Sequence, residues 1–503
     1  MLSAPHPSRP DYRPSFTISF GAKTVYVDLV EKDKAGRSFY GLAYLHDCRW
    51  RRRFHSAQHS PYLQLKTADW NDESVFVRLS RFLKRQGITP RRLEEATILA
   101  HIIRTPQLCK ELDAFIDYLR AYILQFKNSL MSFARLSRQL KQNHDAYARR
   151  RARAFLRLFR PLFYAYRRWL DDHQGYDFVD MINQATRAVG DIAECAKGYR
   201  YVLLDEAQDL SPNRFRLIKA ILAKNPGCRF FAVGDDWQSI YRFTGSRLDL
   251  IYDFEQHFGL HTRRSLIEQT HRFGQPTIRV SCDFVTKNPQ QVRKQIRGDP
   301  QRHTPVNVVL SSQRGNDTPA LLRVLAKLHD EQATAFADLE LQIISRYNHD
   351  ISRLRSMPDF TVLSAEAVSW RGKIIPFCSM HKSKGITRDV VIVLNMNSTP
   401  HGMPATRETD PLSDLLLSRA ENYAFAEERR LFYVAITRAR HATYLIAERQ
   451  HPSPFLFEIS DELNELYQKL CPRCRSGELL RKGNISYCSN FRYGCDYLKR
   501  HPT

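Results

Sequence analysis

Two short apolar runs in the middle of the chain each end in polar residues. The first is Tyr201 to Leu204, which is followed directly by Asp205 and Glu206, and the second is Arg229 to Val233, which is followed by Gly234. A short, β-favouring apolar run with polar ends is typical of a strand that is buried on both faces of a parallel sheet. The first run therefore predicts a buried strand with two carboxylates at its carboxyl end, where open α/β sheets bind ligands.

The remaining apolar pattern predicts a mixture of helices and strands. The stretch from about Ala43 to Leu170 is largely helical, and Leu431, Val434 and Ala435 form one apolar face of a helix over Glu427 to Arg440. Further strand-like runs lie at Thr24–Val30, Val306–Leu310, Leu341–Ile344 and Val390–Asn395. An α/β protein is therefore expected.

Composition narrows the class of partner. The chain has 503 residues, a formal net charge of +24 and 43% hydrophobic residues. That length predicts two to four domains, and the absence of an apolar run approaching 18 residues predicts a soluble protein. A large positive surplus favours a polyanionic partner, and nucleic acid is expected over a membrane because no basic amphipathic segment stands beside an apolar anchor. The first seven residues have no apolar core for secretion, so a cytoplasmic location is expected.

The two carboxylates after the first run suit a nucleotide site. Asp205 can hold the Mg²⁺ that a nucleotide carries, and Glu206 can polarise an attacking water. The alternative is that these acidic residues merely cap a helix.

The stretch that follows the second run adds complementary chemistry. Gly234 allows a tight exit from the strand, and the amide of Gln238 can contact a phosphate. The rings of Tyr241 and Phe243 offer flat faces to unstacked bases.

Together these two stretches resemble motifs II and III of the UvrD/Rep-like superfamily 1 DNA helicases, and most of all those of the helicase-IV-like type. The carrying residues are Tyr-Val-Leu-Leu-Asp-Glu-Ala-Gln-Asp from Tyr201 and Val-Gly-Asp-Asp-Trp-Gln-Ser-Ile-Tyr-Arg-Phe from Val233. The resemblance implies tandem RecA-like domains that bind ATP and Mg²⁺ between them and translocate 3′ to 5′ along DNA, single-stranded or partly duplex, in repair or recombination. It also implies that Asp205 binds Mg²⁺, that Glu206 is the catalytic base, and that Gln208 and Gln238 contact the nucleotide.

Three later segments resemble further motifs of the family in the expected order. Leu266 to Phe273 resembles motif IV, which implies that His271 and Arg272 contact the nucleotide and that Arg272 stabilises charge on the transferred phosphoryl group. Phe377 to Thr387 resembles motif V, and Glu427 to Arg440 resembles motif VI. The implied contacts are Ser379 and His381 to DNA, Gly385 to the nucleotide and Arg438 to the γ-phosphate.

The resemblance also predicts the domain organisation. Residues 1–200 are expected to hold the remainder of the first motor domain with a helical inserted subdomain, and residues 201–265 the first RecA-like domain. Residues 266–455 are expected to form the second RecA-like domain, and residues 468–503 a small zinc ribbon.

A phosphate-binding loop of the form G-x4-G-K-[S/T] is expected in such an enzyme but does not occur in these 503 residues. The nearest stretch, Gly21 to Thr24, has alanine before its lysine and leads into a strand instead of a helix. The first RecA-like domain is therefore expected to be incomplete. Three hypotheses follow: the protein starts upstream of Met1, the missing half comes on a separate chain that bears the loop, or the chain is a single-stranded DNA-binding relic without turnover.

Two clusters of arginine stand outside these motifs. Arg49-Trp50-Arg51-Arg52-Arg53 and Arg149-Arg150-Arg151-Ala152-Arg153 both have aromatic residues close by. Each cluster has two interpretations, a solvated helix face over an aromatic core or a contact to DNA.

The carboxyl-terminal tail carries two pairs of cysteines. The spacing Cys471-x2-Cys474-x13-Cys488-x6-Cys495 is typical of a zinc ribbon with four thiolate ligands. The tail resembles the small ribbons of bacterial type IA topoisomerases, which implies either single-stranded DNA binding or a purely structural role. We therefore expect one Zn²⁺ here.

Overall fold

The structure is a computed structural model. It describes residues 12–21, 23–30, 41–66, 74–91, 93–142, 146–259, 262–312, 316–331, 335–406, 411–417, 421, 423–472, 479–488 and 497–500. The chain divides into two units, Met1–Ile123 with Ser132–Gly175 and Leu124–Met131 with Tyr176–Thr503. No described helix is both long enough and apolar enough to cross a membrane.

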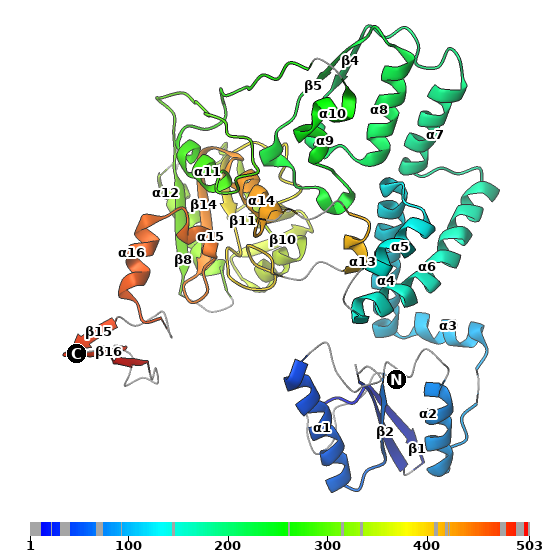
Figure 1. Cartoon of the computed structure of the whole chain (residues 1–503). Helices are drawn as coiled ribbons and strands as arrows, with labels where there is room; N and C mark the ends of the chain where they lie inside the picture. The colour runs from blue at the N-terminus through cyan, green and yellow to red at the C-terminus, as the bar shows by residue number, and fades with distance from the viewer. Residues whose placement is uncertain are drawn as a thin grey trace. The chain divides into compact units, whose positions relative to one another are not determined.

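The first unit combines a small sheet with a set of helices (Figure 1). Its elements are β1 (Phe16–Phe20), β2 (Lys23–Val30), α1 (Gly41–Ala57), β3 (Tyr62–Lys66), α2 (Ser74–Arg85), α3 (Glu95–Arg104), most of α4 (Pro106–Ser129), α5 (Phe133–Gln142) and α6 (Ala146–Asp172). Strand β2 pairs antiparallel with β1 and parallel with β3. Because β2 begins at Lys23, the stretch that superficially resembles a phosphate-binding loop leads into a strand, as predicted.

The two faces of this sheet differ in polarity. Side chains alternate along a strand, so Val25 and Val27 of β2 lie on one face and form an apolar cluster with Leu65, Val75 and Leu83. The opposite face carries Tyr26, Asp28, Tyr62 and Gln64. All of these except Tyr62 are buried, and Tyr62 is partly buried. A polar face that is closed off from water must satisfy its hydrogen bonds internally.

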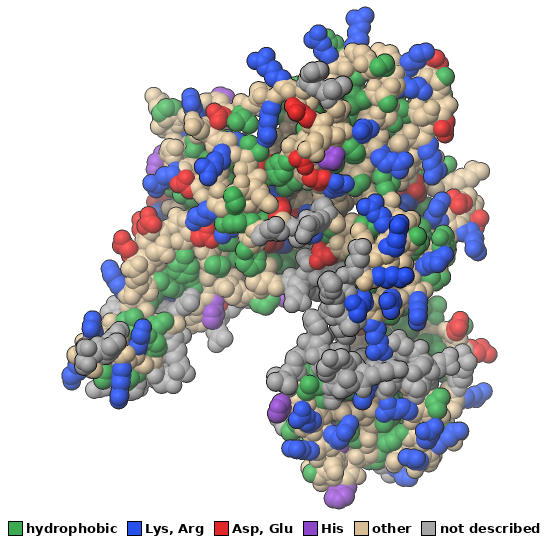
Figure 2. All heavy atoms as spheres, in the orientation of Figure 1, with side chains coloured by type: hydrophobic (Ala, Val, Ile, Leu, Met, Phe, Trp, Pro, Cys, Tyr) green, Lys and Arg blue, Asp and Glu red, His purple; other side chains and the backbone are tan. Residues whose placement is uncertain are grey.

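Helices α4 and α6 pack through aromatic rings. Tyr122 contacts Phe155 and Phe159 edge to face, with ring centroids 4.7 Å apart in both pairs. Most arginines of α6, such as Arg153 and Arg157, are exposed, whereas Arg149 and Arg150 are partly buried. Lys and Arg side chains spread over these helices in Figure 2. For the second arginine cluster, Arg149 to Arg153, this arrangement matches the interpretation of a solvated helix face over an aromatic core. A contact of this cluster with DNA stays a prediction.

The second unit begins with a two-stranded parallel sheet. Its elements are α7 (Phe178–Asp191), β4 (Tyr201–Leu204), η2 (Ala207–Asp209), α8 (Pro212–Lys224), β5 (Arg229–Ala232), η3 (Asp236–Gln238), η4 (Arg242–Thr244), α9 (Asp249–Tyr252) and α10 (Phe254–Phe258). Both predicted strands are present and pair in parallel from Tyr201 with Arg229 to Leu204 with Ala232.

The prediction that the first strand is buried on both faces is wrong. Tyr201 and Leu203 are 64% and 74% exposed, and Phe231 on β5 is 59% exposed. One face is covered, because Phe230 stacks on Phe254 of α10 at 5.6 Å. Among the described residues β4 pairs only with β5, and no further layer covers the opposite face.

A larger sheet follows in the same unit. Its strands are β8 (Val306–Ser311), β9 (Leu341–Ser345), β10 (Phe360–Ser364), β11 (Ala367–Trp370), β12 (Lys373–Ser379), β13 (Arg388–Val393) and β14 (Ala439–Glu448), in the order β10-β11-β12-β9-β13-β14-β8. Strands β12, β9, β13, β14 and β8 run parallel, whereas β10 and β11 form an antiparallel edge. The predicted strands at Val306, Leu341 and Val390 all lie in this sheet.

Helices and short strands surround this sheet. They are β6 (Gln275–Pro276), α11 (Thr277–Val285), β7 (His303–Thr304), α12 (Thr318–Glu331), η5 (Asn348–Ser356), α13 (Pro411–Asp414), α14 (Ala426–Ile436), α15 (Pro454–Phe457), α16 (Asp461–Lys469), β15 (Leu479–Lys482), β16 (Ile485–Cys488) and β17 (Leu498–Arg500). One core cluster joins α11, α14 and α15 to the sheet, and a second joins α12 and η5 to it.

Helix α14 corrects a prediction about the helix over Glu427 to Arg440. All its residues from Arg429 to Ile436 are buried, so it has no single apolar face. It ends at Ile436, and Arg438 lies in the connection to β14. Trp237 and Ile240, from the loop after β5, belong to the same core cluster and are fully buried. The loop is therefore anchored against the larger sheet.

Candidate functional site

The loop after β5 begins with a close approach of two chain segments. A Cβ on Gly234 would lie 2.8 Å from Oε1 of Gln208 and 3.1 Å from its backbone nitrogen, so a side chain here would displace Gln208. The backbone N–H of Asp235 donates to that same Oε1 at 2.9 Å. Gln208 therefore ties the end of β4 to the end of β5 and is 1% exposed.

Four predicted nucleotide residues from three separate parts of the sequence line one cavity. It has a volume of about 540 Å³, and its lining includes Gln238, His271, Arg272, Arg438 and Tyr433. Arg438 Nη2 approaches Oε1 of Gln238 at 3.5 Å, and Arg272 Nη1 donates to the Thr437 carbonyl at 3.4 Å. His271 is exposed.

Of the arginines at this cavity, Arg440 pairs with Glu340 and Asp389, whereas Arg272 and Arg438 lack carboxylate partners among the described residues. Arg438 is 1% exposed and donates to the Val434 carbonyl at 2.8 Å. Burial, together with the positive charge of Arg272, lowers the pKa of Arg438 to about 10. Burial also lowers the pKa of Arg272. Two desolvated cations beside an open cavity favour an anionic ligand, and phosphate suits the planar guanidinium fork.

The predicted catalytic carboxylates lie at the end of β4, outside the cavity lining. Asp205 is exposed, and its carboxylate accepts from the backbone N–H of Glu206 at 2.8 Å. Glu206 adopts a left-handed φ of +50°, and its carboxylate accepts from the side-chain amide of Gln208. The ammonium of Lys384 lies 3.1 Å from Glu206 and 2.6 Å from Asp209.

The predicted DNA contacts gather around the loop after β5. The ring of Phe243 is 46% exposed and meets His381 edge to face at 5.2 Å. Tyr241 lies 6.1 Å from Phe243 and donates from its hydroxyl to the His381 carbonyl at 3.2 Å. The ammonium of Lys384 stands 5.2 Å from the Tyr241 ring centre. Lys384 therefore contacts both Glu206, the candidate base, and the aromatic cluster of Tyr241, Phe243 and His381.

The motif V segment joins this cluster at the carboxyl end of β12. Ser379 is 8% exposed, and its backbone N–H donates to Asn348 at 3.1 Å. Burial, with a smaller effect of Arg346, lowers the pKa of His381 to about 4, so this ring is neutral near pH 7. Gly385 adopts a φ of +83°, which a side chain would strain.

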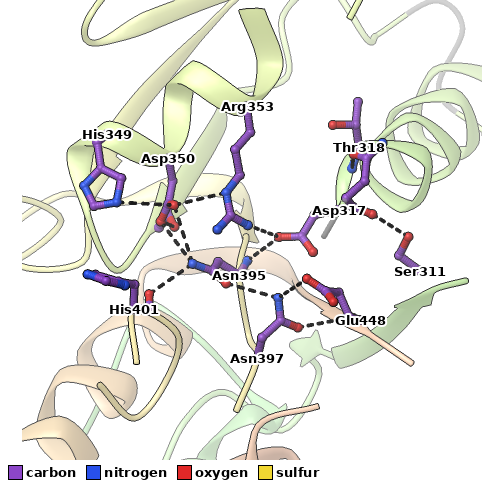
Figure 3. A network of polar contacts seen from close by, with 12 residues as sticks. Ser311, Asp317, Thr318, His349, Asp350, Arg353, Asn395, Asn397, His401 and Glu448 are labelled. Atoms are coloured by element: carbon purple, nitrogen blue, oxygen red, sulfur yellow. Dashed lines mark hydrogen bonds and ion pairs between the residues drawn. The ribbon is translucent and has the colours of Figure 1, made fainter. Parts of the chain in front are cut away.

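A network of buried polar side chains holds the carboxyl edge of the larger sheet (Figure 3). The backbone N–H of Asn395 donates to Asp317 at 2.8 Å, and its side-chain amide reaches Asp350 at 3.4 Å. Arg353 lies 3.4 Å from Asp350 and 3.8 Å from Asp317. Asn397 continues the network by donating to Glu448 at 3.2 Å. Figure 3 shows these side chains pointing toward one another from the start of α12, from η5, from the segment after β13 and from the end of β14, so these segments are held together.

The cysteine pairs are described only in part. Cys471 and Cys488 are both fully buried and pack together with Tyr497. Cys474 and Cys495 lie outside the described residues. No cluster of three or more metal-binding side chains occurs in the part of the chain that the structure describes.

Two residues that the motifs did not single out belong to this site. Lys384 joins Glu206 to the aromatic cluster, and its place directly before Gly385 was the available signal. Asp235 lines the cavity and accepts from Gln238 at 2.6 Å and from Lys294 at 2.5 Å. Nothing in the sequence near Lys294 predicted its contact.

Comparison with known proteins agrees with this arrangement. The UvrD/REP helicase N-terminal domain matches residues 44–259, and the UvrD-like helicase C-terminal domain matches residues 311–450. DNA helicase IV of Escherichia coli (strain K12) is 32% identical over 305 residues, which are 60% of this chain and 41% of that protein.

Two more relatives match less closely. A probable DNA helicase of Mycoplasma pneumoniae is 22% identical over 56% of this chain and 51% of its own length. The ATP-dependent DNA helicase Rep of Escherichia coli (strain K12) is 25% identical over 34% of this chain and 26% of its own length. The chain thus spans about half or less of the length of these relatives. Because the N-terminal and C-terminal domains both match, in order and together over most of its length, the chain belongs to the UvrD/REP helicase family.

Proposed function

We propose that this protein is part of an ATP-dependent 3′-to-5′ DNA helicase or translocase of the helicase-IV-like type, with tandem RecA-like domains, that acts on single-stranded and partly duplex DNA in repair or recombination. The observation that carries this proposal is the convergence of Gln238, Arg272 and Arg438 on one cavity. Residues 238 and 438 are 200 positions apart, so only the packing of the larger sheet against the loop after β5 brings them together.

In this proposal Arg272 and Arg438 bind the terminal phosphates of ATP. Their burial strengthens the attraction to a phosphate, and their mutual repulsion is relieved when an anion enters. Arginines in such a position contribute roughly 10³ to 10⁵ in rate where they have been tested. Gln238, held by Asp235, senses the γ-phosphate. Asp205 would hold the Mg²⁺, whose chemistry when bound is to neutralise charge on the phosphates.

Glu206 is the proposed general base. A carboxylate that activates water must be released from tight ion pairs, and Glu206 is paired with Lys384. Since Lys384 also approaches the Tyr241 ring, DNA that moves Tyr241 would weaken this pair. This contact offers a route by which DNA binding stimulates hydrolysis.

The proposed DNA path runs over Tyr241, Phe243 and the segment from Ser379 to His381. Exposed aromatic rings stack on bases without sequence preference. The neutral ring of His381 adds a further flat face without a charge.

The exposed face of the β4–β5 sheet supports an additional segment that carries the phosphate-binding loop. Parallel sheets are normally covered on both faces, and a two-stranded sheet is marginal alone. Tyr201, Leu203 and Phe231 present a continuous apolar surface beside Asp205. A strand and helix bearing G-x4-G-K-[S/T] would cover this surface and deliver the loop to the carboxylates. That segment belongs either to a longer form of this chain or to a separate chain.

The alternative function is a single-stranded DNA-binding relic that does not hydrolyse ATP. It is supported by the Lys384 to Glu206 ion pair, which occupies the candidate base. The two functions differ in their response to an added loop segment.

The deciding experiment measures DNA-stimulated ATPase activity. The 503-residue polypeptide is expected to show no appreciable turnover, because positioning of the phosphates is lost without the loop. Fusion of the loop-bearing half of a relative should restore turnover toward the range of roughly 1 to 100 per second. Glu206→Gln should then abolish turnover and leave nucleotide binding intact. Full activity of the 503-residue polypeptide would refute the argument about the loop, and an inactive fusion that still binds nucleotide would favour the relic.

We also propose that the tail binds one Zn²⁺ through Cys471, Cys474, Cys488 and Cys495. The burial of Cys471 and Cys488 in one small cluster supports this site. Four thiolates would supply a closed, structural metal site and much of the folding energy of so short a segment.

A further inference from the structure

The polar face of the sheet in the first unit is built around one buried carboxylate. Asp28 is fully buried and accepts from the hydroxyls of Tyr12 and Tyr62 at 2.7 and 2.8 Å. The ring of His55 stacks on Tyr62 at 4.2 Å with an interplanar angle of 10°. Burial, together with Asp28, raises the pKa of both tyrosines, so both hydroxyls remain donors. Neutral donors therefore satisfy most of the charge of Asp28.

Helix α1 lies over this face and carries four arginines and one aspartate. Two of the arginines have internal roles. Arg51 lies 2.6 Å from Asp47 and 3.5 Å from Asp28, and Arg52 donates to Gln64 at 3.1 Å. These contacts fix the helix on the sheet.

The other arginines face a hollow instead. Arg49 and Arg53 of α1, with Arg13 from the segment before β1, line a cavity of about 800 Å³. All three are exposed, and none has a carboxylate partner among the described residues. Asp47 is the one carboxylate in the described lining, and Arg51 already pairs with it. The hollow thus keeps a surplus of positive charge.

An aromatic wall completes the hollow. Trp50 lines it and stacks on Phe54 at 5.2 Å with an interplanar angle of 24°. Tyr12 meets Trp50 edge to face at 5.6 Å. Because Asp28 accepts from the Tyr12 hydroxyl, the Tyr12 ring is held in its place against Trp50.

We propose that this hollow binds single-stranded nucleic acid, with Arg13, Arg49 and Arg53 on the phosphates and Trp50 against a base. Guanidinium groups around an aromatic ring match the alternation of phosphate and base along a strand. The volume falls within the range of about 300 to 1,000 Å³ that is usual for ligand pockets, so a nucleotide unit fits. An acidic protein surface would use the charges but not the aromatic wall. The site lies in the first unit and does not depend on ATP chemistry.

The first test removes charge from the hollow in the full chain. The double variant Arg49→Ala/Arg53→Ala is compared with Arg81→Ala/Arg85→Ala, which removes the same charge from α2. Binding of a labelled 20-nucleotide oligo-dT is followed by fluorescence anisotropy across a salt series. Loss of two phosphate contacts should reduce the steepness of log affinity against log salt concentration by about 1.4. The affinity should fall about 25-fold at 0.1 M salt, whereas the α2 variant should change little. Equal effects of the two double variants would overturn the proposal.

A second test distinguishes nucleic acid from other polyanions. Trp50→Leu should weaken binding of oligo-dT but not of an abasic strand of the same length, whereas Trp50→Phe should retain most of the affinity. Circular dichroism checks that each variant remains folded. Tripolyphosphate and unlabelled oligo-dT, at matched charge, are compared as competitors of the labelled strand. If both displace it equally well and Trp50→Leu has no effect, the hollow is a general anion site and the assignment to nucleic acid fails.

A third comparison separates this site from the proposed motor path. The hollow variant Arg49→Ala/Arg53→Ala is combined with Tyr241→Ala/Phe243→Ala. If the two sites are independent, their losses of affinity should add. A loss only with the hollow variant would support this proposal and refute the motor path. A loss only with Tyr241→Ala/Phe243→Ala would do the reverse.

Discussion

Replacement of Asp317 by asparagine should make the larger sheet more stable near neutral pH. Asp317 is 4% exposed, and burial raises its pKa from the ordinary value of 3.8 to about 6. The Asn395 N–H and Arg353 oppose this shift, and Glu448 adds to it. One carboxylate oxygen of Asp317 has no hydrogen-bond partner, so the charged form is incompletely satisfied (Figure 3).

The sign follows from proton linkage. Between pH 3.8 and about 6 the folded protein binds the proton of Asp317 more tightly than the unfolded chain does. The free energy of unfolding therefore falls as the pH rises through this window, and it stays lower above it. A shift of about two pKa units corresponds to about 3 kcal/mol. Asparagine does not titrate and can still accept from the Asn395 N–H. The free energy of unfolding of the variant, relative to that of the parent, should therefore rise by up to about 3 kcal/mol between pH 4 and pH 7.5.

Native-state hydrogen exchange of peptides that cover β13 measures this local stability at each pH. Asp389→Asn is the matched control, because Asp389 lies at the start of the same strand. Although burial opposes it, hydrogen bonds from the Glu340 backbone and Arg440 lower the pKa of Asp389. Its contribution is present above the unfolded pKa and is lost as the pH falls, so this variant should be less stable at pH 7.5.

The reasoning would be refuted if the difference in local stability between Asp317→Asn and the parent protein stayed the same from pH 4 to pH 7.5. The carboxylate would then be stabilised by its network as fully as it is by water.

Three further predictions concern the candidate site and the tail. Tyr241→Ala and Phe243→Ala should each weaken single-stranded DNA binding by about 1 to 3 kcal/mol, and unchanged affinity in anisotropy titrations would remove these rings from the DNA path. In a fusion with restored turnover, Arg438→Ala should lower the ATPase rate by roughly 10³ to 10⁵, and a drop below tenfold would contradict its role. Elemental analysis of reduced protein should find one zinc per chain and none in Cys488→Ser, since thiolate ligands hold a structural zinc.

The sequence alone determined the local elements and the order of the motifs. The apolar runs at Tyr201 and Arg229 predicted two parallel strands, and both are present. The runs at Val306, Leu341 and Val390 predicted strands of the larger sheet. These features depend on neighbouring residues, because the periodicity of apolar side chains reports on a segment's own backbone.

Only the tertiary structure decided which of these elements meet and which remain uncovered. The cavity that joins Gln238 to Arg438 depends on contacts across 200 positions, and periodicity does not encode such distances. The same holds for the contact of Lys384 with Glu206 and for the contact of Tyr12 with Trp50. The exposed face of β4 was mispredicted for this reason, since an apolar run records that a strand prefers burial and not whether a layer is present to bury it.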